Sequence, residues 1–208
     1  MRHRFWVAAL AAASLAGATE AKGQAAPRDT GLILSTPEAA IEAPVERYKA
    51  MSILVDLSDR TLFVLDDGEV VRRFPVSVGA EGYDTPAGAY RITHMIWNPS
   101  WTPPNSAWAR DYKYEPPGSP ANPMGRVKMF FRAPDLYIHG TALPSSLGRA
   151  RSHGCVRMRN TDAVELARMV MVNGGEPKTP EWFQETIAKA DTSREVRLPR
   201  PMRVRIRA

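Results

Sequence analysis

Residues 152–157 read Ser-His-Gly-Cys-Val-Arg, and residues 137–141 upstream of them read Tyr-Ile-His-Gly-Thr. Cys155 lies between a glycine and a β-branched residue, near two histidines, as a thiol nucleophile requires. An adjacent imidazolium would lower the thiol pKa and supply the reactive thiolate. His139 ends a predicted strand and is the expected base, because a rigid element can hold it. In an extended segment His153 would point away from Cys155, so we expect it to act through its bulk and main chain.

Two glycines complete the predicted catalytic group. Gly154 removes the side chain beside the nucleophile, so the N–H groups of Gly154 and Cys155 are expected to converge on the oxyanion of an acyl intermediate. Gly140 allows a main-chain carbonyl to approach the imidazole of His139 and fix its tautomer. The predicted catalytic residues are therefore Cys155, His139, Gly140, His153 and Gly154.

Four further residues are predicted to bind the substrate. Arg157 and Arg151 flank Cys155 and can bind carboxylates of an acidic substrate through paired hydrogen bonds. Ser152 belongs to the same run, and Trp101 either packs a long loop or lines a substrate groove. We expect no metal and no cofactor, because zinc would make Cys155 a ligand rather than a nucleophile and no fourth ligand is evident.

The surrounding sequence predicts a mainly β domain. Alternating apolar residues separated by tight turns predict an antiparallel meander of strands at 48–57, 61–65 and 69–78. Further strands are expected at 89–96, 126–131, 136–139 and 202–206, with helices at 163–172, after an N-cap at 160–162, and at 180–190. Residues 97–125 have no strand or helix periodicity and are interpreted as a functional lid.

The length of 208 residues suits one domain. Residues 1–18 combine a basic start, an apolar run and small residues, which predicts a secretory signal peptide; an uncleaved anchor is the alternative. We expect a tether at 19–47, a catalytic domain at 48–174 and a basic extension at 175–208 that completes the domain.

Charge and cysteine content narrow the function further. Cleavage after residue 18 would remove Arg2 and Arg4 and lower the formal net charge from +6 to +4, so the protein would stay basic. Such a balance suits a polyanionic partner, and export disfavours nucleic acid as that partner. Cys155 is the only cysteine, which excludes an intramolecular disulfide and requires that an exported thiol be buried or functional.

These residues together resemble the L,D-transpeptidase catalytic domain family of the YkuD type. The family pattern, a His-Gly followed downstream by Ser-His-Gly-Cys-(Val/Ile)-Arg, is met at 139–140 and 152–157. The opening meander agrees with it, as do the motifs Thr-Pro-Ala-Gly at 85–88, Trp-Thr-Pro-Pro at 101–104 and Asn-Pro-Met-Gly at 122–125. The long aromatic and proline-rich insertion is similar to a Gram-negative, ErfK/YbiS-like subgroup, whereas the arginine-rich tail is atypical.

The resemblance implies a mainly β, sandwich-like fold with one or two short helices and a periplasmic, cysteine-dependent acyl transfer on peptidoglycan stem peptides. Cys155 would attack the carbonyl of diaminopimelate and release the terminal D-alanine. An acceptor would then resolve the thioester: another stem peptide, giving a 3–3 cross-link, a lysine of an outer-membrane lipoprotein, a free D-amino acid, or water. Carbapenems would inhibit the protein by acylating the same thiol.

Competing functions are judged on the same residues. A serine D,D-transpeptidase or β-lactamase needs a serine followed three residues later by lysine, which the sequence lacks. A papain-like endopeptidase places its cysteine before its histidine, whereas here His139 precedes Cys155. Two alternatives stay open: an L,D-carboxypeptidase or other hydrolase that uses the same residues, and a non-catalytic wall-binding protein with a vestigial site.

Overall fold

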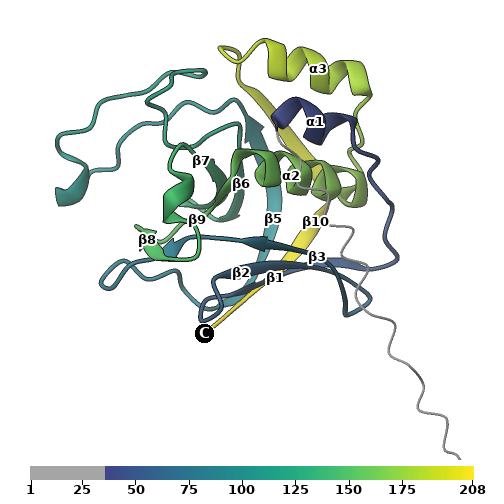
Figure 1. The fold of residues 1–208 in the computed structure, drawn as a ribbon, viewed down its shortest axis with the longest axis horizontal. Helices are drawn as coiled ribbons and strands as arrows, with labels where there is room; N and C mark the ends of the chain where they lie inside the picture. The colour runs from purple at the N-terminus through teal and green to yellow at the C-terminus, as the bar shows by residue number, and fades with distance from the viewer. Residues whose placement is uncertain (1–35) are drawn as a thin grey trace, which may run out of the picture.

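The computed structural model describes residues 36–208 (Figure 1). The predicted signal peptide and the first part of the predicted tether lie outside the described residues. The rest of the tether differs from expectation, because Pro37–Glu42 forms a helix, α1. Its Ala40 and Ile41 are buried, and the guanidinium of Arg168 donates hydrogen bonds to the carbonyls of Ala40 and Ala43. This short segment therefore packs on the domain.

The described residues form one mixed eight-stranded sheet in the order β3-β2-β1-β10-β5-β6-β7-β9. Its strands are β1 (Met51–Asp56), β2 (Thr61–Asp66), β3 (Glu69–Pro75), β5 (Gly88–Trp97), β6 (Val127–Arg132), β7 (Leu136–Thr141), β9 (Val156–Arg159) and β10 (Arg194–Arg207). The predicted meander is confirmed in β1 to β3, which pair antiparallel. Two short strands, β4 (Val78–Gly79) and β8 (Ala150–Ser152), pair in parallel as a second sheet.

The basic C-terminal segment contributes a central strand. β10 lies between β1 and β5, pairing in parallel with the first and antiparallel with the second. Its apolar side chains, among them Val196, Met202, Val204 and Ile206, are buried, while the arginines between them face outwards. The arginine-rich composition thus reflects the period of a strand that has one buried face.

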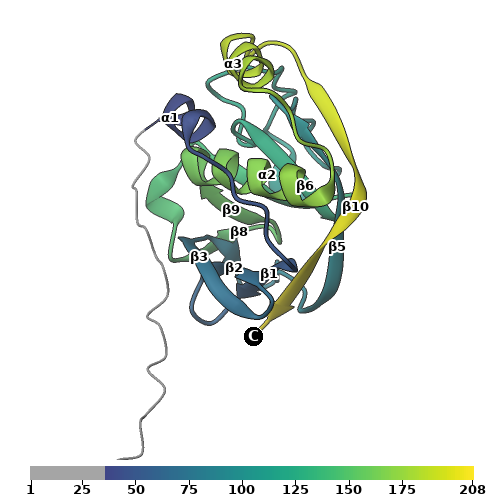
Figure 2. The same ribbon diagram turned by 90° about the vertical axis from the view of Figure 1, so that its right-hand side faces the viewer.

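Helix α2 (Asn160–Gly174) lies against the sheet and anchors the core (Figures 1 and 2). Leu166, Val170 and Met171 of α2 belong to a hydrophobic cluster that also contains side chains of β1 to β7, β9 and β10. Figure 2 shows β5 and β10 side by side along the molecule, with β1 to β3 at one end. The mainly β prediction is confirmed, with three α-helices in residues 36–208 rather than one or two.

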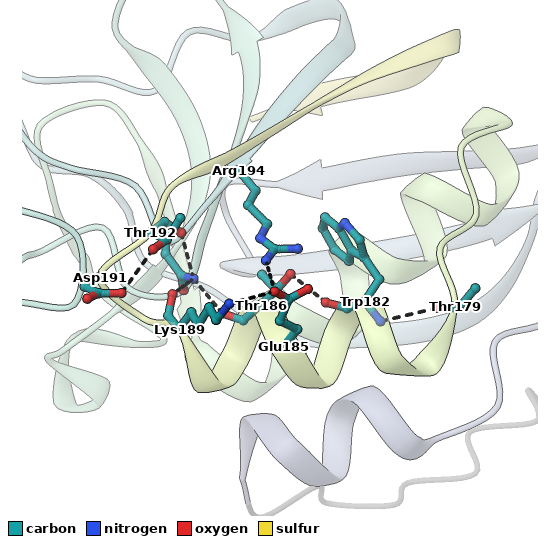
Figure 3. Close-up of polar contacts among 9 residues, drawn as sticks. Thr179, Trp182, Glu185, Thr186, Lys189, Asp191, Thr192 and Arg194 are labelled. Carbon is teal, nitrogen blue, oxygen red and sulfur yellow. Dashed lines mark hydrogen bonds and ion pairs between the residues drawn. The ribbon is translucent and has the colours of Figure 1, made fainter.

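Helix α3 (Pro180–Ala188) is fastened at both ends (Figure 3). The hydroxyl of Thr179 accepts a hydrogen bond from Trp182 N–H at 3.3 Å, which caps the N-terminus. Glu185 pairs with Lys189 at 2.9 Å and with Arg194 at 3.0 Å, which ties the helix to the start of β10. None of the helices in the described part of the chain has the length and apolar character needed to cross a membrane.

The loop at 97–125 is ordered by its own polar contacts. Trp101 and Glu115 exchange main-chain hydrogen bonds of 2.8 and 2.9 Å. The buried amide of Asn122 donates to the carbonyl of Pro99 at 2.7 Å and accepts from Met124 N–H at 2.9 Å. A short 3-10 turn, η1 (Ala107–Ala109), carries Trp108 at the tip of the loop.

Candidate active site

Parallel pairing of β7 and β9 brings the two halves of the sequence motif together. Ile138 lies opposite Val156, and His139 lies opposite Arg157. Cys155 comes directly before β9, so the same register sets it beside Tyr137 and on the face that carries His139. The residues that were predicted to be nucleophile and base therefore share one face of two neighbouring strands.

The thiol of Cys155 is partly exposed and held by the main chain at the start of β7. Its Sγ donates to the carbonyl of Asp135 at 3.4 Å, and the N–H of Tyr137 donates to the sulfur. Surrounding protein raises the pKa of the Cys155 thiol to about 11, although Arg157 and Lys128 oppose this shift. The expectation of a thiol with a lowered pKa is wrong for the resting site, because desolvation outweighs the nearby cations.

His139 is buried, with 1% of its surface exposed. Its Nδ1 donates to the carbonyl of Gly140 at 2.6 Å, as predicted for a carbonyl that fixes the tautomer. A carbonyl can only accept, so Nδ1 carries the proton of the neutral ring and Nε2 keeps its lone pair. The pKa of His139 is lowered to about 3, first by burial and then by Arg157 and Lys128, while main-chain hydrogen bonds with Gly140 and Met124 act in the opposite direction. Imidazole and thiol are thus both neutral at rest.

The turn that presents Cys155 depends on Ser152 and Gly154. The hydroxyl of Ser152 donates to the carbonyl of Cys155 at 2.6 Å and accepts from Gly154 N–H at 3.2 Å. Ser152 is buried and shapes the turn, and its role in substrate binding stays a prediction. Because the N–H of Gly154 is already paired, the predicted two-donor oxyanion hole is reduced to the N–H of Cys155. Gly154 has φ +101°, which explains why glycine is required there.

Thr85 links this turn to the rest of the domain. Its buried hydroxyl accepts from Gly79 N–H at 2.8 Å and donates to the carbonyl of Gly154 at 2.9 Å. The Thr-Pro-Ala-Gly motif at 85–88 therefore supports the loop that carries Cys155. Sequence reasoning had noted the motif without giving the hydroxyl a role.

Asn160 supports the base, although it was predicted to cap a helix. The N-cap of α2 is Arg159, and the amide of Asn160 instead reaches towards β7. Its Oδ1 accepts from Arg126 N–H at 3.2 Å and its Nδ2 donates to the carbonyl of Thr141 at 3.4 Å. The amide also fills the space where a Cβ on Gly140 would lie. Asn160 thus fixes the main chain whose carbonyl orients His139.

His153 is held between aromatic rings. Its ring stacks on Trp108 with centroids 3.8 Å apart and planes 8° apart, and Tyr83 approaches it edge-on at 4.5 Å. Trp108 thereby fastens the 97–125 loop beside the nucleophile. Trp101, which was predicted to bind substrate, is instead 8% exposed and packs on Tyr112 within the loop.

The two arginines of the motif lie in different surroundings. Arg157 on β9 is half-buried and acts electrostatically on both Cys155 and His139. Arg151 on β8 is exposed and has no side-chain hydrogen bond or ion pair to another described residue, so its predicted role in binding stays a prediction. No cluster of three or more potential metal-ligating His, Cys, Asp or Glu side chains occurs in residues 36–208.

The chain is similar in sequence to several known proteins. A putative L,D-transpeptidase YkuD of Bacillus licheniformis is 33% identical over 118 residues, which cover 57% of this chain and 59% of the relative. A probable L,D-transpeptidase YbiS of Escherichia coli is 31% identical over 182 residues, which cover 83% and 57%. The chain thus spans less than two thirds of the length of these curated relatives. L,D-transpeptidase 3 of Mycobacterium tuberculosis aligns with a TM-score of 0.49 at 18% identity, covering 76% of this chain and 61% of that one.

The family assignment rests on a family model that covers most of the described residues. The family model for the L,D-transpeptidase catalytic domain, YkuD, matches residues 50–187, a range that begins just before β1 and ends in α3. It includes the whole site built around Cys155 and His139. The similarity to YbiS and to a probable L,D-transpeptidase ErfK/SrfK of Escherichia coli, 33% identical over 119 residues covering 53% of this chain and 38% of that one, supports the predicted Gram-negative subgroup. The chain belongs to the L,D-transpeptidase catalytic domain family.

Proposed function

We propose that this protein is a peptidoglycan L,D-transpeptidase in which Cys155 is the nucleophile and His139 the general base. The observation that carries the proposal is that the β7–β9 register places a partly exposed thiol and a buried imidazole on the same face of two neighbouring strands. The Gly140 carbonyl fixes the imidazole so that Nε2 can accept a proton. Family membership supplies the reaction class.

Acylation starts from the neutral pair. The thiol leaves its bond to the Asp135 carbonyl, its proton passes to Nε2 of His139, and the sulfur attacks the diaminopimelate carbonyl. The carbonyl carbon forms a bond to sulfur, and the resulting oxyanion accepts a hydrogen bond from Cys155 N–H. When the intermediate collapses, the C–N bond breaks and the D-alanine nitrogen takes the proton from His139. A thioester and free D-alanine result.

Deacylation reverses these roles. An acceptor amine attacks the thioester carbonyl carbon and forms a new C–N bond, while His139 removes a proton from its nitrogen. The C–S bond then breaks, and His139 returns the proton to the sulfur. A second stem peptide, a lysine of an outer-membrane lipoprotein and a D-amino acid all fit this step. Water in the same place gives an L,D-carboxypeptidase, which is the second candidate because it needs the same residues and no acceptor site.

We infer a periplasmic location from the sequence of residues 1–18, which are proposed to form a signal peptide ahead of the catalytic domain. Carbapenems are proposed inhibitors, because opening of their β-lactam ring by the thiol yields an acyl enzyme of the same kind.

Intact-mass spectrometry tests the proposal. The protein should gain the mass of one carbapenem at Cys155 and should release D-alanine from a tetrapeptide stem. Cys155→Ser should gain no mass, and His139→Ala should acylate more slowly because the thiol loses its base. Folded protein that has a reduced thiol but gains no mass would instead support the wall-binding protein with a vestigial site.

A further inference from the structure

A row of three side chains crosses the site on adjacent strands. Lys128 on β6 pairs in register with His139 on β7, and His139 pairs with Arg157 on β9. Residues paired in register point to the same face, so the imidazole has a cationic neighbour on either side. With strands about 4.8 Å apart, the outer two Cα atoms lie roughly 10 Å from each other. Two long side chains can converge on one ligand across that distance.

Aromatic rings fix the position of the Lys128 ammonium. Its Nζ lies 5.3 Å from the ring centroid of Phe130 and 5.1 Å from that of Tyr137, within the range of cation–π attraction. The two rings pack edge to face, with centroids 4.7 Å apart. The half-buried lysine is therefore held over an apolar floor next to Cys155, and burial lowers its pKa.

Neither cation has an acidic partner in the described part of the chain. Other cationic side chains do: Arg72 pairs with Glu165, and Arg207 pairs with Asp56. No salt bridge joins Lys128 or Arg157 to a carboxylate of residues 36–208. Leaving two half-buried cations without a counter-charge is costly, which favours a site that a ligand anion completes.

An effect on the pKa values of Cys155 and His139 does not explain why Lys128 and Arg157 lie beside them. Each lowers the pKa of Cys155, which favours proton loss from sulfur, and each also lowers the pKa of His139, which disfavours proton gain by the ring. The two effects oppose one another in a transfer from Cys155 to His139. Asp135, the acid that faces the thiol, raises the pKa of Cys155 and does not pair with Lys128.

We propose that Lys128 and Arg157 form a carboxylate-binding subsite that positions the donor stem peptide against Cys155. This inference rests on the proposed transpeptidase function and extends it to Lys128, which becomes a specificity-determining residue. A donor stem carries carboxylates at its terminal D-alanine and on the diaminopimelate side chain. Both offer the charge-assisted hydrogen bonds that ammonium and guanidinium groups donate.

Donors with single carboxylates removed test the subsite. The rate constant kcat/KM for release of the terminal residue is measured on three tetrapeptide donors: the free acid, the D-alaninamide form and the form amidated on diaminopimelate. The enzymes are the unchanged protein, Lys128→Met, Lys128→Arg and, as a matched control, Lys49→Met. Lys49 is exposed and pairs with Asp67 on the β2–β3 turn, away from the Lys128–His139–Arg157 row.

We expect Lys128→Met to lower kcat/KM on the free-acid donor by about tenfold to a hundredfold, mainly through KM, as loss of a charged hydrogen bond does. Most of this loss should disappear on one of the amidated donors, which identifies the bound carboxylate. Lys128→Arg should retain more activity than Lys128→Met, and Lys49→Met should match the unchanged protein. Equal losses on all three donors, or no loss, would overturn the subsite.

Binding to Cys155→Ala separates this inference from the proposed chemistry. Calorimetry gives the Kd of each donor for Cys155→Ala with and without Lys128→Met, and no turnover is needed. One outcome is that Cys155→Ala prefers donors with one particular carboxylate only when Lys128 is present, while the unchanged protein releases no D-alanine. This outcome would support the subsite and refute the transpeptidase function. Binding that ignores Lys128 would refute the subsite even if the protein is active.

Discussion

The substitution Gly140→Ala introduces a steric clash and tests how the side chain of His139 is held in place. The carbonyl of Gly140 accepts the 2.6 Å hydrogen bond from His139. A methyl group at position 140 would lie well inside 3.0 Å of Asn160 Oδ1, whereas its next neighbours, Asn160 Cγ and Gly125 Cα, would be 3.1 and 3.4 Å away. The conflict is thus with a single amide. Overpacking of this kind should reduce the free energy of unfolding by about 1–3 kcal/mol.

Removal of the amide should relieve the conflict. Asn160→Ala alone leaves the N–H of Arg126 without its 3.2 Å partner and should cost about 1–3 kcal/mol. The double variant Gly140→Ala/Asn160→Ala should then be less destabilised than the two single changes add up to, by about 0.5–3 kcal/mol. The double variant should be acylated by a carbapenem faster than Gly140→Ala is, because the main-chain carbonyl of residue 140 returns to the position where it accepts a hydrogen bond from His139.

Gly125→Ala is the matched control for this rescue. A methyl group there would also meet Asn160 Oδ1, but it would lie 2.9 Å from two main-chain atoms of Gly140, and Gly125 has φ +66°. Asn160→Ala removes neither the clash with the Gly140 main chain nor the backbone strain at position 125, so it should not rescue Gly125→Ala. Urea unfolding gives the free energies, and intact mass gives the acylation rates. Additive losses in Gly140→Ala/Asn160→Ala, or equal rescue of Gly125→Ala, would refute the assignment of Asn160.

Three further predictions concern the surroundings of the site. Thr85→Val should lose about 1–3 kcal/mol in urea unfolding and slow acylation, whereas Thr85→Ser should preserve both, because the hydroxyl joins Gly79 to Gly154. Trp108→Ala should leave the melting temperature nearly unchanged while raising amide hydrogen exchange in the 97–125 loop, since its stack on His153 fastens the loop. The pKa of His139 is about 3 in the folded protein and near 6.5 in the unfolded chain, so its contribution to stability should be full above pH 6.5 and should be lost as the pH falls towards 3. Urea midpoints measured across this range should therefore fall, and they should fall less steeply in His139→Gln.

Local patterning explains which elements could be predicted. Alternating apolar residues and tight turns define β1 to β3, and the 3.6-residue period defines α2, because each pattern reports one buried face. The sequence predicts a strand only at 202–206, whereas the pairing of β10 with β5 starts at Arg194 and is interrupted by a bulge between Arg197 and Met202. Ala40 and Ile41 of helix α1 are buried where the helix packs on α2 and α3, a tertiary contact that no local pattern reveals.

The candidate site divides in the same way. Cys155, His139 and Gly140 belong to two short motifs, at 139–140 and 152–157, so the sequence alone predicts them as site residues. Lys128 and Thr85 reach the site through strand register and a long-range hydrogen bond, which sequence spacing does not encode. Asn160 was misassigned because asparagine commonly caps helices, and here a tertiary contact with Arg126 takes precedence.

The pKa values of Cys155 and His139 indicate that both side chains are neutral in the resting site. Burial raises the pKa of Cys155 and lowers that of His139, so desolvation disfavours both ionised forms. A protonated thiol is a poor nucleophile and resists oxidation better than a thiolate does. In the proposed reaction, charge separates only when the thiol attacks, and the negative charge then develops on the substrate oxygen beside Cys155 N–H. A site of this kind depends on correct placement of the donor, which is the task that the unpaired cations Lys128 and Arg157 are positioned to perform.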